Sequence, residues 1–248
     1  MQRYFVEPEY WNPPAIRLKD DDAKHILKVM RMQEGDNIIC LDNKGTSALC
    51  RIEAIQENSV EVHIIKNIND NPELPITTVI AQGLAKGDKL DLVVQKGTEL
   101  GVSRFCFFAA ERSVVKWEPK KAEKKMERLR KIAKEAAEQA GRIFIPEITY
   151  FFHFKDILQE SKQYEAKILV FEEEAKRNQH LGLKEILKQP QASIFAIIGP
   201  EGGISPLEAD LCNQEAILSV SLGPRILRTE TAPLYLLSVL SYQYELLR

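Results

Sequence analysis

Strand-like and helical patterns alternate along most of this 248-residue chain, and this alternation limits its fold more than any other feature. Short runs rich in β-formers recur after residue 75, and longer stretches with apolar residues at helical spacing separate them. This order is typical of a mostly parallel sheet with helices on its faces. We therefore predict an α/β domain over residues 72–248, with strands at 76–82, 104–109, 143–149, 167–171, 193–198 and 218–222.

The first 71 residues follow a different pattern. Three runs rich in β-formers lie at 37–42, 48–55 and 60–65, and turn residues separate them, which predicts a small β-barrel or sandwich. A helix interrupts this part, because four apolar residues recur at helical spacing: Ala23, Ile26, Leu27 and Met30. The segment 67–75 contains two prolines and several turn formers, so we predict a linker there and domains of residues 1–71 and 72–248.

Composition excludes several classes of protein. Hydrophobic residues make up 44% of the chain and charged residues 28%, as in ordinary globular proteins. No apolar run is long enough to span a bilayer, and the first residues lack a signal-peptide core, so we predict a cytoplasmic protein without a membrane segment. A formal net charge of −2 gives no protein-wide basic surface, although it allows local basic patches.

The cysteines have no spacing that indicates a metal site or a disulfide framework. Cys40, Cys50, Cys106 and Cys212 form no Cys-x-x-Cys pair, and most of them have apolar neighbours in the sequence. This pattern favours buried thiols, and we predict no bound metal.

A glycine-rich loop follows the predicted strand at 193–198. It contains Gly199, Gly202 and Gly203, and Ser205 and Glu208 then have the spacing of a capping box at the start of a helix. Ligands of open α/β sheets gather at the carboxyl ends of strands, where this loop is expected. The loop lacks the known nucleotide-phosphate motifs, so a ligand site and a structural turn remain alternatives.

A second loop, at 222–233, also leads from a strand into a helix. Two arginines, a glutamate and two threonines precede the apolar helix, whereas Thr229 or Thr231 alone would suffice as its cap. These additional polar residues favour a functional role for the loop.

Two further features leave alternatives open. The helical segment 120–142 is rich in basic residues, and Lys124, Arg128 and Lys131 are candidates for phosphate contacts or for an ordinary solvated helix face. His25 is a candidate for stacking on a base, or is a half-buried histidine on a helix surface.

Taken together, the two loops resemble the cofactor-binding region of the RsmE family, the 16S ribosomal RNA uridine-N3-methyltransferases of the SPOUT superfamily. Further matches lie at 86–91, 95–102, 111–113 and 135–142, and weaker ones at 3–5 and 25–31, so the resemblance covers essentially the whole chain. Gly97 and Leu129 stand where the family pattern has alanine and tryptophan, and these departures concern packing more than the site.

The resemblance implies a PUA-like β-barrel that helps to hold RNA, a C-terminal trefoil-knotted domain, a homodimer, and S-adenosyl-L-methionine as cofactor. The substrate it implies is 16S rRNA in the small ribosomal subunit. The implied cofactor-binding residues lie in three loops: Phe171, Glu172, Ile198, Gly199, Pro200, Glu201, Gly202, Gly203, Leu222, Gly223, Ile226, Leu227 and Arg228. Candidate RNA contacts are Arg3, His25, Arg31, Lys96, Arg112 and Arg142, with structural ion pairs as the alternative for the last three.

The chemistry of such a reaction calls for a base or a cation. The N3 atom of uridine carries a proton at neutral pH, so its attack on a sulfonium methyl group requires loss of that proton or stabilisation of the anion. Arg225 or Arg228 would stabilise the anion, and Glu201, Glu230 or Glu172 would accept the proton. Rival hypotheses are a non-catalytic RNA-binding factor, which would not bind the cofactor, and an enzyme for a phosphorylated small molecule, which would depend on magnesium or nucleotide.

Overall fold

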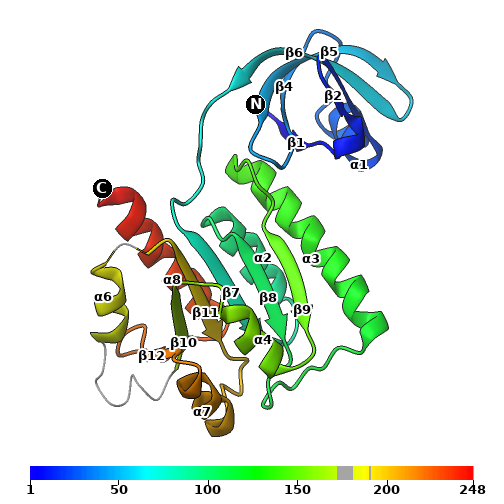
Figure 1. Cartoon of the computed structure of the whole chain (residues 1–248). Coiled ribbons are helices and arrows are strands. Elements are labelled where there is room, and N and C mark those ends of the chain that lie inside the picture. The colour runs from blue at the N-terminus through cyan, green and yellow to red at the C-terminus, as the bar shows by residue number, and fades with distance from the viewer. Residues whose placement is uncertain (172–180, 190, 248) are drawn as a thin grey trace. The chain divides into compact units, whose positions relative to one another are not determined.

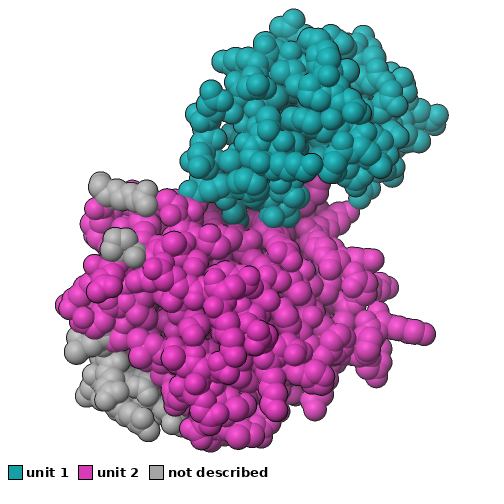
Figure 2. All heavy atoms as spheres, viewed as in Figure 1, with its two compact units in different colours: residues 1–73, 137–145 teal, residues 74–136, 146–248 magenta. Residues whose placement is uncertain are grey.

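The computed structural model describes residues 1–171, 181–189 and 191–247. The chain forms two compact units, coloured separately in Figure 2. Unit 1 consists of Met1–Glu73 and Ala137–Ile145, and unit 2 consists of Leu74–Ala136 and Pro146–Arg248. The sequence pattern did not assign the segment Ala137–Ile145 to the first part of the chain.

Unit 1 is built on a curled sheet with the strand order β1-β4-β5-β6-β3-β2. All neighbouring strands are antiparallel except β1 and β4. Apolar side chains that alternate along the strands, such as Ile16, Leu18, Val60 and Val62, fill its interior. The strands are β1 (Arg3–Phe5), β2 (Trp11–Asn12), β3 (Ala15–Lys19), β4 (Asn37–Leu41), β5 (Ser47–Gln56) and β6 (Ser59–Ile68).

The structure confirms the three strands predicted in this unit and adds β1, β2 and β3, which the sequence pattern missed. These strands have only two to five residues, too few for a clear periodicity. The predicted helix is divided into α1 (Asp20–Lys24) and a π-helical turn, η2 (His25–Val29). Ala23 and Ile26 are nevertheless buried, as their spacing predicts.

A buried ion pair fixes the end of the long helix α3 (Pro119–Ala140) within unit 1. Arg142 is 4% exposed, and its Nε donates to Glu73 Oε2 at 3.0 Å. The other carboxylate oxygen of Glu73 accepts from the Ile143 N–H at 2.9 Å. Ile143 packs with Phe5 and Leu41 in a separate apolar cluster.

Unit 2 has a parallel sheet with the strand order β12-β10-β11-β7-β8-β9 (Figure 1). Its strands are β7 (Thr77–Gly83), β8 (Arg104–Phe108), β9 (Glu147–Phe151), β10 (Ala166–Val170), β11 (Ser193–Ile198) and β12 (Leu218–Val220). Besides α3, the helices are α2 (Lys89–Glu99), α4 (Phe154–Ser161), α6 (Leu181–Leu187), α7 (Pro206–Gln214) and α8 (Thr231–Ser241), and a π-helical turn η3 (Tyr242–Leu246) follows α8. The predicted α/β class is therefore confirmed.

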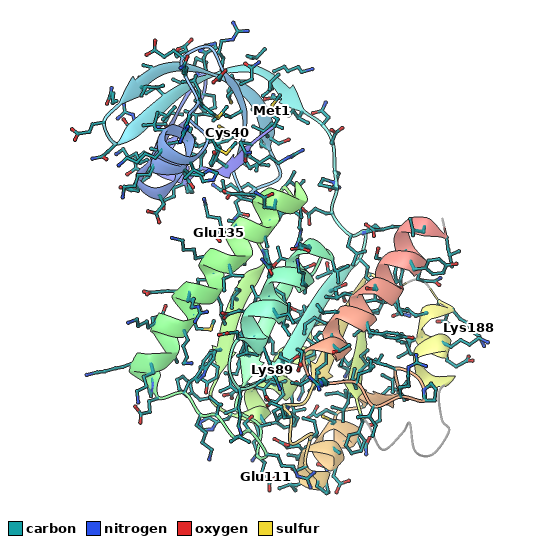
Figure 3. The ribbon with its side chains drawn as sticks, turned by 180° about the vertical axis from the view of Figure 1, so that it is seen from behind. Met1, Cys40, Lys89, Glu111, Glu135 and Lys188 are labelled. Carbon is teal, nitrogen blue, oxygen red and sulfur yellow. The ribbon has the colours of Figure 1, made fainter. Side chains whose placement is uncertain are left out.

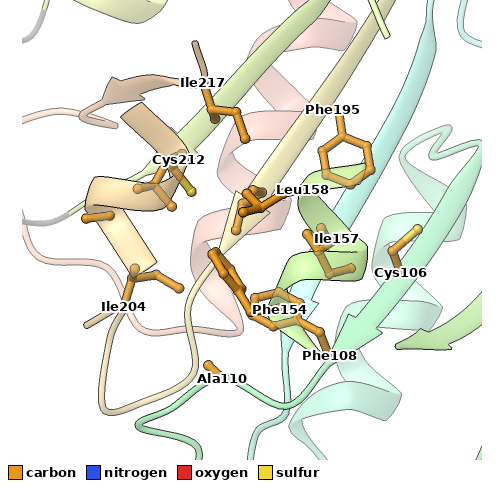
Figure 4. Packing of buried hydrophobic residues seen from close by; sticks show 14 of the residues in the cluster. Cys106, Phe108, Ala110, Phe154, Ile157, Leu158, Phe195, Ile204, Cys212 and Ile217 are labelled. Carbon is orange, nitrogen blue, oxygen red and sulfur yellow. The ribbon is translucent and has the colours of Figure 1, made fainter. Parts of the chain in front are cut away.

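Helices cover both faces of this sheet. On one face, Phe154 and Ile157 of α4 and Cys212 of α7 pack against Phe108 and Phe195 (Figure 4). On the other face, α2 packs closely on β8 and beside α8. A Cβ atom on Gly97 of α2 would lie 2.8 Å from the Phe105 ring of β8 and 3.5 Å from Leu237 of α8. All four cysteines are buried free thiols, as predicted.

One predicted strand is wrong in its extent. The pattern at 143–149 predicted one strand, but β9 begins at Glu147. Pro146 has no N–H to donate to a neighbouring strand, and the residues before it belong to unit 1. Hydrophobicity alone does not distinguish a strand from an apolar segment that packs elsewhere.

No helix among the described residues is long and apolar enough to cross a membrane. Within the same residues, no group of three or more His, Cys, Asp or Glu side chains is arranged to hold a metal ion. The absence of a bound metal stays a prediction.

Replacing Arg142 by methionine should lower the free energy of unfolding of unit 1 by about 3 kcal/mol, because breaking a buried pair leaves the other charge uncompensated. Glu73→Gln should have a similar effect, and urea denaturation followed by circular dichroism measures both. The double variant should cost less than the sum of the two single changes. Additive losses would show that the pair does not act as a unit.

Candidate functional site

A pocket of about 500 Å³ lies at the carboxyl ends of β10, β11 and β12 in unit 2. Its volume is that of a typical small-molecule site. The loop after β11 and the loop after β12 supply most of its wall. The residues that line it are Lys89, Arg112, Val170, Phe171, Ile198, Gly199, Pro200, Glu201, Gly202, Gly203, Ile204, Ser221, Leu222, Gly223, Arg225, Ile226, Leu227, Arg228, Thr229 and Ala232.

The predicted capping box ends the first of these loops. Ser205 Oγ accepts from the Glu208 N–H at 3.3 Å, and Glu208 Oε2 accepts from the Ser205 N–H at 2.9 Å. Glu208 Oε1 also accepts from the Glu111 N–H at 2.8 Å. The start of α7 therefore holds the loop after β8 beside the glycine loop.

Thr229 ties the second loop to the ends of two strands. Its hydroxyl donates to the Gly199 carbonyl at 2.7 Å and accepts from Gln82 Nε2 at 2.9 Å. The sequence suggested Thr229 or Thr231 as the cap of the last helix, but Glu230 stands at the N-cap of α8 and no side chain caps it. The hydroxyl of Thr229 instead makes hydrogen bonds within the wall of the pocket.

Glu201 is held by two donors, one in the loop before α2 and one at the first residue of α2. The Lys86 N–H and Lys89 Nζ donate to Glu201 Oε1 at 3.0 and 2.8 Å, and Figure 3 labels Lys89. Burial opposes ionisation of Glu201, but the hydrogen bonds from Lys89 and Lys86 outweigh it and lower the pKa of this carboxyl. The bond with Glu201 also raises the pKa of Lys89. A carboxylate held in this way is a poor proton acceptor.

Lys89 also lies 3.6 Å from Glu230 Oε2, so one ammonium group bridges the loop after β11 and the loop after β12. The side chain of Glu230 is only 13% exposed. Its Oε2 is buried and makes no hydrogen bond within the described part of the chain. Glu230 Oε2 therefore faces Lys89 without a hydrogen bond, whereas Glu201 Oε1 accepts two.

Two pocket glycines have a backbone conformation that leaves room for a ligand. Gly203 has φ +72° and Gly223 has φ +110°, and a Cβ atom at either position would meet no atom within 4 Å. Other residues rarely adopt this conformation, and here a side chain would enter the open pocket. Gly202 has another role, because a Cβ atom there would lie 2.6 Å from the Arg112 carbonyl.

The structure brings together twelve of the thirteen cofactor-binding residues proposed from the sequence; Glu172 lies outside the described residues. Arg225 and Arg228, proposed as catalytic, also line the pocket and are exposed. Arg112, proposed as an RNA contact, lines it too and donates weakly to the Ile204 carbonyl at 3.5 Å. The pocket therefore has several cationic groups around an apolar floor.

The other proposed RNA contacts are not among the residues that line the pocket. Arg3 is half-buried, Arg31 is exposed, and the Nδ1 atom of half-buried His25 is 2.9 Å from the Tyr4 hydroxyl. Lys96 pairs with Glu99 at 2.8 Å on α2. Arg142 is the buried partner of Glu73, so its placement favours the ion-pair alternative over a phosphate contact.

Comparison with known proteins identifies this arrangement. A model of an RNA methyltransferase domain matches residues 72–241, and one of an RNA methyltransferase PUA domain matches residues 18–65. Ribosomal RNA small subunit methyltransferase E of Bacillus subtilis is 44% identical over 253 residues, covering 100% of this chain and 99% of that protein. The chain belongs to the RsmE family.

Solved structures agree with membership of the RsmE family. Ribosomal RNA small subunit methyltransferase E of Neisseria gonorrhoeae, bound to S-adenosyl methionine, superposes with a TM-score of 0.86 at 28% identity and 98% coverage of both chains. A Legionella pneumophila protein described as a methyltransferase, in complex with the same cofactor, gives a TM-score of 0.86 at 32% identity and 96% coverage of both.

Sequence reasoning did not assign three polar pocket residues of this RsmE protein to the site: Lys89, Ser221 and Thr229. Lys89 lies in the stretch 86–91, which resembles the family; Ser221 immediately precedes the second loop, and Thr229 lies within it. Their neighbours in space lie far along the chain, since Lys89 and Glu201 are 112 residues apart. No local pattern gives such a pairing.

Gly223→Val should weaken binding of S-adenosylmethionine more than tenfold, because the side chain would enter the pocket where the backbone is now open. Gly35→Val is the matched control, since Gly35 also has a positive φ (+94°) and nothing within 4 Å of its Cβ position, but lies in unit 1. In both variants, a non-glycine residue with a left-handed backbone lowers the free energy of unfolding by about 1–2 kcal/mol. Calorimetric titration should show lost affinity only for Gly223→Val, and equal affinities would remove Gly223 from the site.

Proposed function

We propose that this protein transfers the methyl group of S-adenosylmethionine to N3 of a uridine in the 16S rRNA of the small ribosomal subunit. The observation that carries this proposal is the pocket formed by the two glycine loops, in a chain whose relatives have been solved with this cofactor. Family membership supports the ribosomal substrate. We further propose that the modified nucleotide is a uridine and that its N3 atom accepts the methyl group.

The pocket suits the proposed cofactor in shape and chemistry. Leu222, Ile226 and Leu227 offer apolar contacts for an adenine ring, and the backbone at Gly203 and Gly223 leaves space for close approach. S-adenosylmethionine, when bound, supplies an electrophilic methyl group on a sulfonium centre. The residues of the pocket orient this group and exclude water from it.

The uridine must lose its N3 proton as the new bond to the methyl carbon forms. We assign stabilisation of the developing anion to Arg225 and Arg228, which line the pocket from the loop after β12. Preorganised cations near developing charge are a large source of catalysis in sites shielded from water. Glu230 is the proposed proton acceptor, because Glu201 is already engaged by Lys86 and Lys89.

Glu201→Gln should raise the dissociation constant of the cofactor about three- to tenfold while turnover at saturation stays nearly unchanged, because the partly exposed bridge positions the loops. Glu230→Gln, its matched counterpart, should lower turnover about a hundredfold and leave cofactor affinity intact. Titration calorimetry and single-turnover methylation measure the two quantities. If Glu201→Gln lost turnover and Glu230→Gln did not, the roles would be reversed.

We propose that the protein works as a homodimer. Tyr235, Tyr242 and Leu246 recur at helical spacing along α8 and η3, and they are 39%, 56% and 71% exposed. Leu92 of the neighbouring α2 adds a further exposed apolar side chain at 41%. A second copy of the chain would cover this stripe, as an exposed apolar stripe on a folded protein commonly marks an interface.

Tyr242→Glu should convert the dimer to a monomer, because it places a charge in the centre of the apolar stripe. Leu207→Glu on α7 is the control, since Leu207 is also exposed (65%) but lies on a helix that packs on the opposite face of the sheet. Sedimentation velocity distinguishes the two. A dimeric Tyr242→Glu variant would show that the interface is elsewhere.

The trefoil knot of the family is proposed here as well. After β12 at one edge of the sheet, the chain must return to α8, which packs beside α2. Thr229 lies on this return path and bonds to Gly199 and Gln82, so the segment crosses at the carboxyl ends of β11 and β7. This crossing supports passage through the loop after β11. A cytoplasmic location is consistent with a ribosomal substrate.

A further inference from the structure

We infer that Phe152 is a stacking platform for an unpaired nucleotide of the substrate RNA, at a position outside the cofactor pocket. This inference rests on the proposed function, because it assumes that RNA is the substrate. Phe152 is 46% exposed, directly after the carboxyl end of β9. It is the exposed member of a continuous row of aromatic side chains.

The row holds the Phe152 ring in a fixed orientation. Phe152 contacts Tyr150 edge-to-face, with ring centroids 4.7 Å apart. Tyr150 contacts Trp117 at 5.2 Å, and Trp117 contacts the fully buried Phe107 at 6.4 Å. An exposed ring fixed by buried neighbours loses little conformational entropy when a base stacks on it.

Tyr150 adds to this rigidity. Burial raises the pKa of Tyr150, and a hydrogen bond with the backbone of Trp117 partly offsets the shift. The phenol is therefore neutral at physiological pH and is held against the chain on which Trp117 lies. The ring that supports Phe152 therefore contacts Trp117 both through its aromatic surface and through its hydroxyl.

A basic residue of α3 contacts the aromatic row. The ammonium group of Lys125 lies 5.2 Å from the centre of the Trp117 ring, as in a cation–π contact. The segment 116–128 contains six basic and three acidic residues, although the whole chain has a net charge of −2. A local excess of positive charge next to an exposed aromatic ring matches the phosphate and base of a single-stranded nucleotide.

The aromatic row and the pocket share the loop after β8. Arg112 lines the pocket, and Trp117 follows it by five residues in the same loop after β8. Because all strands of the sheet are parallel, Phe152 after β9 lies on the same edge as the pocket loops. The loop after β8 thus reaches both the pocket wall, through Arg112, and the aromatic row, through Trp117, and we infer that bound RNA follows it.

Single-stranded RNA is the occupant that this surface fits best. Two cationic groups next to the aromatic row, Lys125 over the Trp117 ring and Lys116 immediately before Trp117 in the chain, would favour a polyanion over another protein surface of mixed charge. Sequence-independent binding of single strands commonly combines base stacking on aromatic rings with cations that contact the backbone. A second copy of this chain is the competing occupant, and the test below includes it.

The test compares Phe152→Leu with Phe152→Trp in the full-length protein. Phe152→Leu keeps an apolar side chain but cannot stack, and its dissociation constant for a 16S rRNA fragment should rise about five- to thirtyfold, corresponding to ~1–2 kcal/mol at 1.4 kcal/mol per tenfold. Phe152→Trp should keep the wild-type affinity, and its added fluorescence should be quenched by RNA relative to wild type. Leu218→Ala is the control, because Leu218 is another exposed apolar side chain (47%) of unit 2, at the amino end of β12 and therefore at the opposite end of the strands from the pocket loops.

The outcomes separate this inference from the proposed function. Cofactor affinity measured by calorimetry should be equal in all four proteins, and the KM for RNA should rise in Phe152→Leu while kcat stays unchanged. Wild-type RNA affinity in Phe152→Leu, with methylation intact, would overturn the platform and leave the proposed function standing. A change in sedimentation mass without a change in RNA affinity would assign the surface to a second copy and also overturn it. If wild-type protein failed to methylate RNA, the proposed function would fail, and the binding comparison would still decide the platform.

Discussion

The pocket depends on one hydrogen-bonded group, the hydroxyl of Thr229, which joins Gln82 at the end of β7 to the Gly199 carbonyl at the end of β11. Gln82 is fully buried and Thr229 is 8% exposed, so these bonds are made in a low-dielectric interior where leaving a polar group unpaired is costly. The segment between β12 and α8 is thereby fixed against the sheet. Both glycine loops take their positions from this junction.

Ion pairs fix the positions of the charged side chains at the entrance of the pocket. Lys89 reaches a carboxylate in each loop, Glu201 and Glu230, and so opposes their mutual repulsion while leaving the arginines of the second loop exposed. The two carboxylates consequently have different environments. Glu201 Oε1 accepts two hydrogen bonds, whereas the buried Glu230 Oε2 has only the longer ion pair with Lys89, and such a difference commonly separates a structural group from a reactive one.

Much of unit 2 could be predicted from its sequence because its elements are long and regular. Five of the six predicted strands lie within a residue or two of the observed ones, and the capping box at Ser205 and Glu208 forms as its spacing predicts. Errors occur where a short element or a distant partner decides the structure. The residues before Pro146 join unit 1, and the short strands β1 to β3 depend on pairing with distant strands.

The candidate site, like the fold, could be predicted from the sequence only in part. The glycines and arginines of the two loops are conspicuous in the sequence, and the structure places them around one pocket. The contribution of Lys89 and the role of Thr229 arise from contacts across more than a hundred residues or between two loops, which periodicity does not encode. The same holds for the aromatic row from Phe107 to Phe152, since its members come from β8, the loop after it, and β9.

We propose that this protein methylates N3 of a uridine in small-subunit ribosomal RNA. The most direct measurement is incubation of the purified protein with labelled S-adenosylmethionine and either free 16S rRNA or assembled small subunits, followed by nuclease digestion and mass spectrometry of the nucleosides. We expect the label in 3-methyluridine from at least one of the two substrates. Label in another nucleoside would contradict the assigned chemistry, and no label from either substrate with active, cofactor-binding protein would contradict the proposed function itself.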